Sequence, residues 1–258
     1  MNEKRSLSYL IMRIPLTKYG WPQVLVVPGI VLVLMLVFGL GAIVLLPPWA
    51  IIFIEAILAA CLIWSLTFFR DPLRRSPADT NFLLAPADGR VTDIGIIEED
   101  NFVGGTTMRI GIFLSIFNAH INRAPCNVKV EKLTYKKGKY KNAMNPESSR
   151  VNESNDLNLT RTDSPQDRLV VRQISGAIAR RIVCDCNAGQ ELTAGEKFGM
   201  IKFGSRTELY VAVRDEDSQP PEDAIVGTAR YRTKCLVQIG DKVKAGLTPL
   251  IKYERCQD

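Results

Sequence analysis

Two long apolar runs lie near the N-terminus of the chain. Residues 24–46 carry no charged side chain, and residues 49–69 carry one, Glu55. Each run is long enough to cross about 30 Å of hydrocarbon as a helix, and Pro47-Pro48 separates the two. We therefore predict a two-helix membrane hairpin with helices at about 24–46 and 49–69. A shallow interfacial pair is the alternative, whereas a cleavable signal peptide would have a shorter apolar run.

The charges around these runs predict an orientation. Basic residues lie before the first run and directly after the second, at Arg70, Arg74 and Arg75, and none lies in the turn. The positive-inside rule then places both ends of the hairpin in the cytoplasm, and the rest of the chain on the cytoplasmic face of the cell (inner) membrane. Glu55 would cost about 3 kcal/mol facing lipid at the bilayer centre, so we expect it near the interface.

From Asp71 onward the pattern changes to short runs of β-forming residues broken by Gly, Pro and Asn. It predicts a mainly β (α+β) fold, with a curved, barrel-like or sandwich-like domain over residues 71–258 following an anchor over residues 1–70. The expected strands cover residues 82–85, 89–97, 109–115, 128–135, 169–174, 181–184, 200–203, 207–213 and 235–239. A polar stretch, residues 136–167, predicts a long surface loop or lid. The glycine spacing at residues 239–250 is typical of hammerhead-like hairpins.

The amino-acid composition limits the classes of partner that the chain is expected to bind. The chain has 258 residues and a net charge of +6, which suits either nucleic acid or an anionic lipid surface. The apolar runs favour lipid and argue against nucleic acid. Six cysteines without zinc-site spacing, together with a single histidine, argue against a metal site and indicate thiols in a reducing compartment.

The dipeptide Gly204-Ser205 lies between the two apolar pieces at 200–203 and 207–213. Locally, a strand kink is the commoner explanation, because glycine inside a strand pattern usually marks a bulge or a close backbone approach. The chemical alternative is a serine nucleophile beside an unhindered carbonyl, since Gly204 lacks a Cβ and tolerates strained backbone.

Two further motifs carry titratable groups. His120, in Phe117-Asn-Ala-His-Ile-Asn-Arg-Ala-Pro125, is the only histidine, and it titrates near neutrality. A lone histidine is more often structural than catalytic, yet His120 is the obvious general acid or base if the chain has one. Asp88, in Pro86-Ala-Asp-Gly89, precedes an expected strand, where an Asx turn is the structural alternative. Arg180 and Arg181 form either a solvated basic edge or an anion contact.

These pieces occur in a familiar order. The chain strongly resembles the short form of the phosphatidylserine decarboxylase family from about Trp49 to Tyr253. The motifs that carry the resemblance are Phe69-Arg-Asp-Pro72, Pro86-Ala-Asp-Gly89, Ile116-Phe-Asn-Ala-His-Ile-Asn-Arg-Ala-Pro125, Gly138-Lys-Tyr, Ala179-Arg-Arg-Ile-Val183, Gly199-Met-Ile-Lys-Phe-Gly-Ser-Arg206 and Gly240-Asp-Lys-Val-Lys-Ala-Gly246. No single motif is decisive, but seven in this order make chance implausible.

The resemblance implies a proenzyme that cuts itself between Gly204 and Ser205, leaving a covalent pyruvoyl group at Ser205 as its cofactor. A large and a small chain would stay associated and decarboxylate phosphatidylserine to phosphatidylethanolamine at the membrane. The resemblance assigns the self-processing roles to Asp88, His120 and Ser205, and leaves open whether His120 acts in cleavage, in decarboxylation or in both.

For the phospholipid head group, the resemblance makes Arg123, Asn122, Arg180 and Arg181 candidate contacts. It leaves a homo-oligomer open. Two alternatives remain: an unprocessed membrane-bound lipid-binding or scaffold relative, and a decarboxylase of a related serine lipid such as archaetidylserine. A β-barrel carrier module is disfavoured, because Lys242 and Lys244 lack a Met-Lys pairing at an exposed turn.

Overall fold

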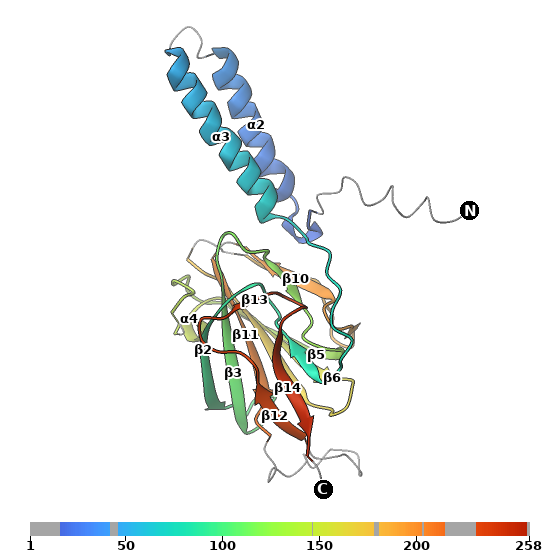
Figure 1. Ribbon diagram of the computed structural model, residues 1–258. Coiled ribbons are helices and arrows are strands. Elements are labelled where there is room, and N and C mark those ends of the chain that lie inside the picture. The colour runs from blue at the N-terminus through green and yellow to red at the C-terminus, as the bar shows by residue number, and fades with distance from the viewer. Residues whose placement is uncertain are drawn as a thin grey trace, which may run out of the picture. The chain divides into compact units, whose positions relative to one another are not determined.

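The computed structural model describes residues 16–41, 46–145, 147–177, 181–202, 204–214 and 231–256. The chain divides into two compact units, Met1–Leu73 and Arg74–Asp258. The first unit is helical, and the regular secondary structure of the second is almost entirely strand (Figure 1).

The N-terminal unit contains two long helices, α2 (Gln23–Gly41) and α3 (Pro48–Phe68), preceded by the short 3₁₀ helix η1 (Lys18–Gly20). Both long helices are long and apolar enough to cross a membrane, with mean hydropathies of 2.8 and 2.3. Residues 42–45 of the predicted first helix lie outside the described residues. The side chain of Glu55 faces α2, since its Oε1 would be 3.7 Å from a Cβ on Gly39.

The second unit contains fourteen described strands and one short helix. The strands are β1 (Phe82–Leu84), β2 (Gly89–Glu98), β3 (Thr106–Leu114), β4 (Ile121–Arg123), β5 (Val128–Lys136), β6 (Ser154–Arg161), β7 (Arg168–Ile174), β8 (Ile182–Cys184), β9 (Glu191–Leu192), β10 (Lys197–Ile201), β11 (Ser205–Ala212), β12 (Tyr231–Cys235), β13 (Lys242–Val243) and β14 (Pro249–Arg255). The helix is α4 (Ser148–Val151).

The strands form one large sheet and two small ones. The large sheet has the order β13-β2-β3-β11-β7-β6-β5-β9 and is curled into a half-barrel (Figure 1). The small sheets have the orders β1-β14-β12 and β4-β10-β8. The interior is filled by alternate apolar side chains of these strands, including Ile112, Leu157, Leu209, Phe198 and Leu250, which are fully buried. Such burial on one face of each strand is what holds the register of an antiparallel sheet.

The mainly β prediction is confirmed, but several details differ, and β4, β9, β13 and β14 were not among the expected strands. The predicted loop at 136–167 is wrong: it contains α4 and all of β6, a central strand of the large sheet. The strand expected at 235–239 is displaced, because β12 ends at Cys235. In the glycine-rich C-terminal segment, β13 pairs with β2 and β14 pairs with β1 and β12, rather than with each other.

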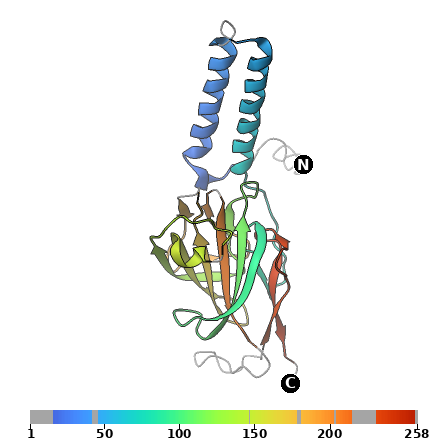
Figure 2. The same cartoon turned by 90° about the vertical axis from the view of Figure 1, so that its left-hand side faces the viewer.

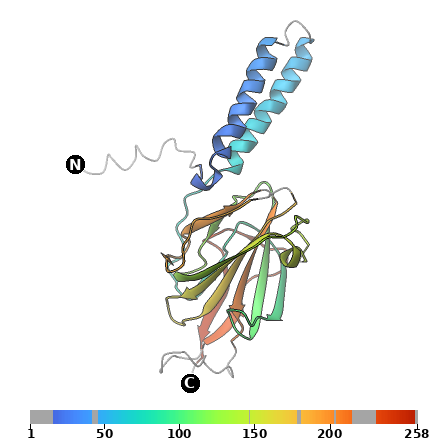
Figure 3. The same cartoon turned by 180° about the vertical axis from the view of Figure 1, so that it is seen from behind.

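The antiparallel register brings several connections to one end of the large sheet. Ser205 pairs with Leu114, Arg206 with Ile174, Ile174 with Ser154, and Ser154 with Lys136. The connections at residues 115–120, 202–204 and 137–153 therefore all emerge at the end where Ser205 lies, which we call the Ser205 end. Figures 2 and 3 show α4, which belongs to the last of these connections, beside the sheet.

Candidate active site at Gly204 and Ser205

Ser205 is the first residue of β11 and is fully buried. Its Oγ has no hydrogen-bond partner among the described residues. Leaving a buried hydroxyl unsatisfied costs about 1–3 kcal/mol, so native structures seldom do it without a reason. The buried, unsatisfied hydroxyl is therefore a feature of Ser205 that a strand kink alone does not explain.

Gly204 adopts a backbone conformation that favours glycine. Its φ is +58°, in the left-handed region that side chains other than glycine rarely adopt. Its carbonyl oxygen occupies space that a Cβ on Gly176 would fill, at only 1.7 Å from that Cβ position. Glycine at residue 176 thus allows the Gly204 carbonyl to pack closely against the backbone that follows β7.

His120 reaches the same region from a neighbouring connection. The connection at 115–120 joins β3 to β4, and the connection at 202–204 joins β10 to β11. Because β3 pairs with β11 and β4 pairs with β10, the two connections start and end on neighbouring strands. The backbone N–H of Ile201 donates to the carbonyl of His120 at 3.3 Å. The tertiary structure therefore brings the segments that carry His120 and Ser205 together.

The imidazole of His120 is fully buried, and its Nδ1 lies 2.9 Å from the carbonyl oxygen of Asn118. A carbonyl only accepts hydrogen bonds, so Nδ1 carries the proton and Nε2 is the basic nitrogen of the neutral ring. Asn118 is itself held in place, because its Oδ1 accepts from the N–H and hydroxyl of Ser115 at 2.9 and 2.8 Å. The arrangement fixes the tautomer that a general base needs.

Asp88 binds an arginine side chain and a backbone N–H. Its Oδ2 accepts from Nη2 of Arg74 at 2.7 Å, and its Oδ1 accepts from Nη1 of Arg74 and from the N–H of Ala245, the latter at 2.8 Å. Such a two-pronged arginine–carboxylate pair is strong and geometrically specific. The structure thus gives the orienting position at Nδ1 of His120 to Asn118, while Asp88 pairs with Arg74.

Asn122 joins three of the sequence motifs. Its Nδ2 donates to the carbonyl of Pro86 at 3.3 Å and to Oγ1 of Thr207 at 3.1 Å, while its Oδ1 accepts from Nε2 of Gln173 at 3.0 Å. The side chain is fully buried. It therefore ties the segments around residues 86, 122 and 207 together beneath the site.

The cationic candidates are distributed unevenly. Arg123 is buried and donates through Nη1 to the carbonyl of Gly195 at 2.9 Å. Arg181 is exposed, and Arg180 lies outside the described residues. Lys202, two residues before Gly204, was not anticipated. It is buried, and burial together with the nearby charge of Arg181 lowers the pKa of its amine. A lysine inside the apolar piece 200–203 is the sequence signal that would have identified it.

Arg206, directly after Ser205, is held by a buried network. Its Nε donates to Oε1 of Glu208 at 2.7 Å, and its Nη1 donates to Oγ1 of Thr92 at 2.6 Å. Its Nη2 forms an ion pair with Asp93 at 2.5 Å. Burial alone would lower the pKa of Arg206, but the carboxylates of Glu208 and Asp93 outweigh it and raise that pKa. The guanidinium crosses β3 at Gly111, where a Cβ would lie 1.9 Å from Nη2.

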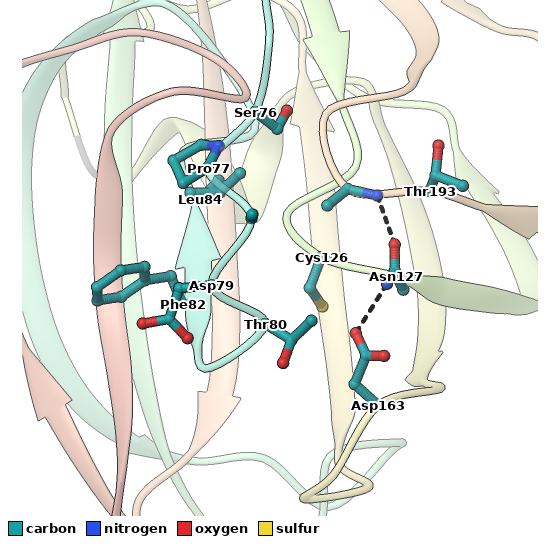
Figure 4. Close-up of a pocket in the computed structure, with 12 residues that line it drawn as sticks. Ser76, Pro77, Asp79, Thr80, Phe82, Leu84, Cys126, Asn127, Asp163 and Thr193 are labelled. Carbon is teal, nitrogen blue, oxygen red and sulfur yellow. Dashed lines mark hydrogen bonds between the residues drawn. The ribbon is translucent and has the colours of Figure 1, made fainter.

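A pocket of about 340 Å³ lies elsewhere in the β unit (Figure 4). Its wall includes Cys126, Asn127 and Asp163 and none of the predicted site residues. Asn127 donates to Oδ2 of Asp163 at 2.9 Å and accepts from the N–H of Ala194 at 2.8 Å. Burial raises the pKa of the Cys126 thiol to about 12, so this cysteine is an unreactive thiol at neutral pH.

Comparison with known proteins points to one family. The sequence model of the family described as phosphatidylserine decarboxylase matches residues 62–250. A phosphatidylserine decarboxylase proenzyme of Rhodopirellula baltica is 35% identical over 242 residues, which cover 94% of this chain and 90% of that protein. Proenzymes of the same name from Azorhizobium caulinodans and Pelagibacter ubique are each 38% identical. Each alignment covers 74% of this chain, with 75% and 80% of the respective relative.

Proposed function

Since the chain belongs to the phosphatidylserine decarboxylase family, we propose that it is a proenzyme that cuts itself at Gly204-Ser205 and then decarboxylates phosphatidylserine to phosphatidylethanolamine. Membership of this family makes it a carboxy-lyase. The observation that carries the proposal is the buried Ser205 hydroxyl without a described partner, next to a left-handed Gly204. Burial also supports an intramolecular reaction, because an external nucleophile has no access to this bond.

The cleavage uses only atoms of this chain and one water. Oγ of Ser205 attacks the carbonyl carbon of Gly204, the C–N bond breaks, and the amide becomes an ester with a free amine on residue 205. Removal of the Cα proton then expels the Gly204 carboxylate by breaking the Cβ–O bond of Ser205. The dehydroalanine that remains takes up water, loses ammonia and becomes the pyruvoyl group.

His120 is the proposed base for these proton transfers. A serine hydroxyl is a weak nucleophile at its own pKa and needs a base beside it. With Nδ1 committed to the Asn118 carbonyl, Nε2 is the nitrogen that accepts a proton. The same nitrogen, once protonated, can return a proton to the substrate Cα after CO₂ leaves. Asp88 then acts through Arg74 and the backbone around Ala245 as a positioning residue.

A pyruvoyl group at residue 205 would supply an electrophilic carbonyl that serves as an electron sink for decarboxylation. It fits the site, because it would form from a side chain already buried and without a described partner. The chain's own contribution is to exclude water and to bind the anionic head group. We assign Lys202 and Arg181, which lie near the scissile bond, to the head-group phosphate, with Arg123, Asn122 and Arg180 as further candidates.

The two chains would stay together after cleavage. β11, which begins the small chain, lies between β3 and β7 of the large chain, and β14 pairs with β1. These backbone hydrogen bonds do not depend on the Gly204–Ser205 bond. The two apolar helices support a membrane protein, and Arg70, Arg74 and Arg75 directly after the second run support an inner-membrane orientation with the β unit on the cytoplasmic face.

Intact mass spectrometry of the purified full-length protein tests the proposal. Wild type should give two chains split after Gly204, the smaller beginning with a pyruvoyl group, and Ser205→Ala should remain whole. Ser175→Ala is the matched control, because Ser175 is equally buried but its hydroxyl is bonded to the Glu153 carbonyl at 3.2 Å. It should cleave normally. A wild type that stays a single 28.8 kDa chain would overturn the proposal in favour of an unprocessed lipid-binding protein.

A further inference from the structure

The connection between β5 and β6 presents an exposed basic surface at the Ser205 end. Its leading segment carries Lys137, Lys139 and Lys141, all exposed, directly after the exposed Lys136 that ends β5. From residue 136 to residue 150 the sequence has five basic residues and one acidic residue, Glu147, a local net charge of +4. A surface with this imbalance attracts an anionic partner.

Large apolar side chains also lie exposed at the Ser205 end. Tyr140 is 39% exposed and Met144 is 56% exposed, both in the same segment. Phe117, in the connection after β3, is 70% exposed and lies three residues beyond Leu114, the partner of Ser205. We call Phe117, Lys137, Lys139, Tyr140, Lys141 and Met144 the docking surface. Aromatic and apolar groups interleaved with lysines are typical of surfaces that bind the interface of an anionic bilayer.

The segment is fixed in place rather than loosely attached. Asn152 is fully buried; its Oδ1 accepts from the N–H of Lys141 at 2.9 Å and its Nδ2 donates to the carbonyls of Lys141 and Ser175, both at 2.8 Å. Lys139 adds a backbone hydrogen bond to Val151 at 2.7 Å. The lysine side chains therefore project from a backbone that is tied to the end of β7.

The same segment borders the scissile bond. A Cβ on Gly176 would lie 3.4 Å from the Cβ of Ala143 and 1.7 Å from the carbonyl oxygen of Gly204. Ala143, which is buried between the exposed Lys141 and Met144, thus packs against the glycine that receives the Gly204 carbonyl. A partner bound at the docking surface would be adjacent to the site.

We propose that the docking surface binds the anionic bilayer directly, so that the β unit receives its lipid substrate at head-group level from the membrane rather than from solution. This proposal rests on the proposed function, because it names how the same site meets its substrate. The reaction converts an anionic serine head group into a zwitterionic ethanolamine one, so docking weakens as the surrounding substrate is consumed. An acidic protein partner is the competing occupant, and the absence of lipid-dependent protection would favour it.

The test uses full-length protein in nanodiscs, so that the helical unit anchors every variant equally. Hydrogen–deuterium exchange is compared between phosphatidylcholine discs and discs that also contain phosphatidylglycerol, an anionic lipid without a serine head group. We expect slower exchange at residues 115–120 and 137–145 in the anionic discs, and a loss of that protection at about 0.5 M salt, where surface charges are screened within several Å.

Charge reversal gives the decisive variant. The triple variant Lys137→Glu, Lys139→Glu, Lys141→Glu should lose the protection. On phosphatidylserine vesicles its apparent KM should rise at least about tenfold, because three attractive charges become repulsive. Its kcat on monomeric short-chain phosphatidylserine should stay within about twofold of wild type, since these lysines do not enter the site chemistry.

The matched control reverses three exposed lysines outside the docking surface, two on β5 and one on β13: Lys129→Glu, Lys132→Glu, Lys242→Glu. It carries the same change in net charge and should behave as wild type in both assays. The proposal would be overturned by equal protection from exchange in both kinds of disc. It would also be overturned if both triple variants lost protection to the same extent. Self-cleavage is read separately by mass, so a failure of the proposed function is distinguishable: an uncleaved wild type can still show, or fail to show, the exchange protection.

Discussion

Two adjacent segments of the chain, residues 202–205 and residues 206–210, differ in the partners of their buried polar groups. In the second, every charge has an opposite charge beside it: Arg206 is bound to Glu208, and Glu208 accepts from the hydroxyl of Tyr210 at 2.6 Å. In the first, the cation Lys202 lies near a second cation, Arg181, and the Ser205 hydroxyl has no described partner. The difference separates the part of the strand that is anchored from the part where we propose that cleavage occurs.

The anchored segment explains how the reactive one is kept in place. The alternation of a strand sends Ser205 and Thr207 to one face and Arg206 and Glu208 to the other. The Arg206 side chain crosses β3 at Gly111 and binds partners on β2 and β11. These contacts fix residue 206 and, through the backbone, the neighbouring residue 205. This hold does not involve the peptide bond that is proposed to break, so it survives cleavage.

The largest effect should come from removing the anchor. Arg206→Met, made in the Ser205→Ala background so that all chains are uncut, leaves the buried Glu208 carboxylate without its cation, while Asp93 keeps its ion pair with Arg109. Breaking one side of a buried ion pair costs about 3–5 kcal/mol, so thermal scanning should show a melting temperature lower by about 10 °C.

Two further variants test the cause of that loss. Adding Glu208→Gln should recover part of it, because the uncompensated buried charge is then removed. Arg90→Met, at an exposed arginine of β2, should change the melting temperature little. If Arg90→Met and Arg206→Met are equally mild, the buried network does not anchor the strand.

Next in size is a change on the reactive side. Gly176→Ala places a methyl group where the Gly204 carbonyl lies, so the carbonyl must move by an ångström or more. A misplacement of that size costs about a hundredfold in rate, and the half-time of self-cleavage, followed by gel electrophoresis after synthesis, should lengthen accordingly.

The matched control for this change is Gly95→Ala in β2, where a Cβ meets nothing closer than 4.0 Å. It should cleave at the wild-type rate. Normal cleavage of Gly176→Ala would show that the packing of the Gly204 carbonyl against residue 176 does not matter for the reaction.

A smaller effect is expected for Thr207→Val, which keeps the shape of the side chain and removes the hydrogen bond from Asn122. Asn122 retains the Pro86 carbonyl as an acceptor, so we expect a loss of about 1 kcal/mol in unfolding free energy and self-cleavage close to wild type. Chemical denaturation measures the first and mass spectrometry the second. Thr106→Val, at an exposed threonine of β3, is the control and should be near neutral.

The smallest expected effect is a pH shift. The lowered pKa of Lys202 means that its amine loses its charge at a lower pH than an ordinary lysine does. If Lys202 contacts the lipid phosphate, the apparent KM should rise as the pH increases through that lowered pKa. Lys202→Arg keeps its charge, so this alkaline rise should move to higher pH. Lys197→Arg, at an exposed lysine of β10, should leave the profile unchanged.

Some strands could be predicted from the local sequence pattern alone, and others could not. Strands with apolar alternation, such as β2 and β7, were predicted close to their observed bounds. β6 was missed because its sequence, with Asn155, Asp156 and Asn158, looks like a loop. It is nevertheless a central strand: Asn155 donates to Oε1 of Gln173 on β7 at 3.1 Å, and Arg172 on β7 binds Asp156. Cross-strand partners that satisfy polar groups are invisible without the fold.

The sequence by itself determined the apolar helices and the β character of the remainder, because both depend on residue type and short-range order. The candidate residues Gly204, Ser205, His120 and Asp88 came from the order of motifs that resembles the family. Only the tertiary structure decided which residues contact these candidates. Pairing across strands placed Gly176 against the Gly204 carbonyl and Arg74 on Asp88. Burial of the Ser205 hydroxyl likewise depends on long-range packing, because segments distant in sequence cover this side chain and so set its exposure to solvent.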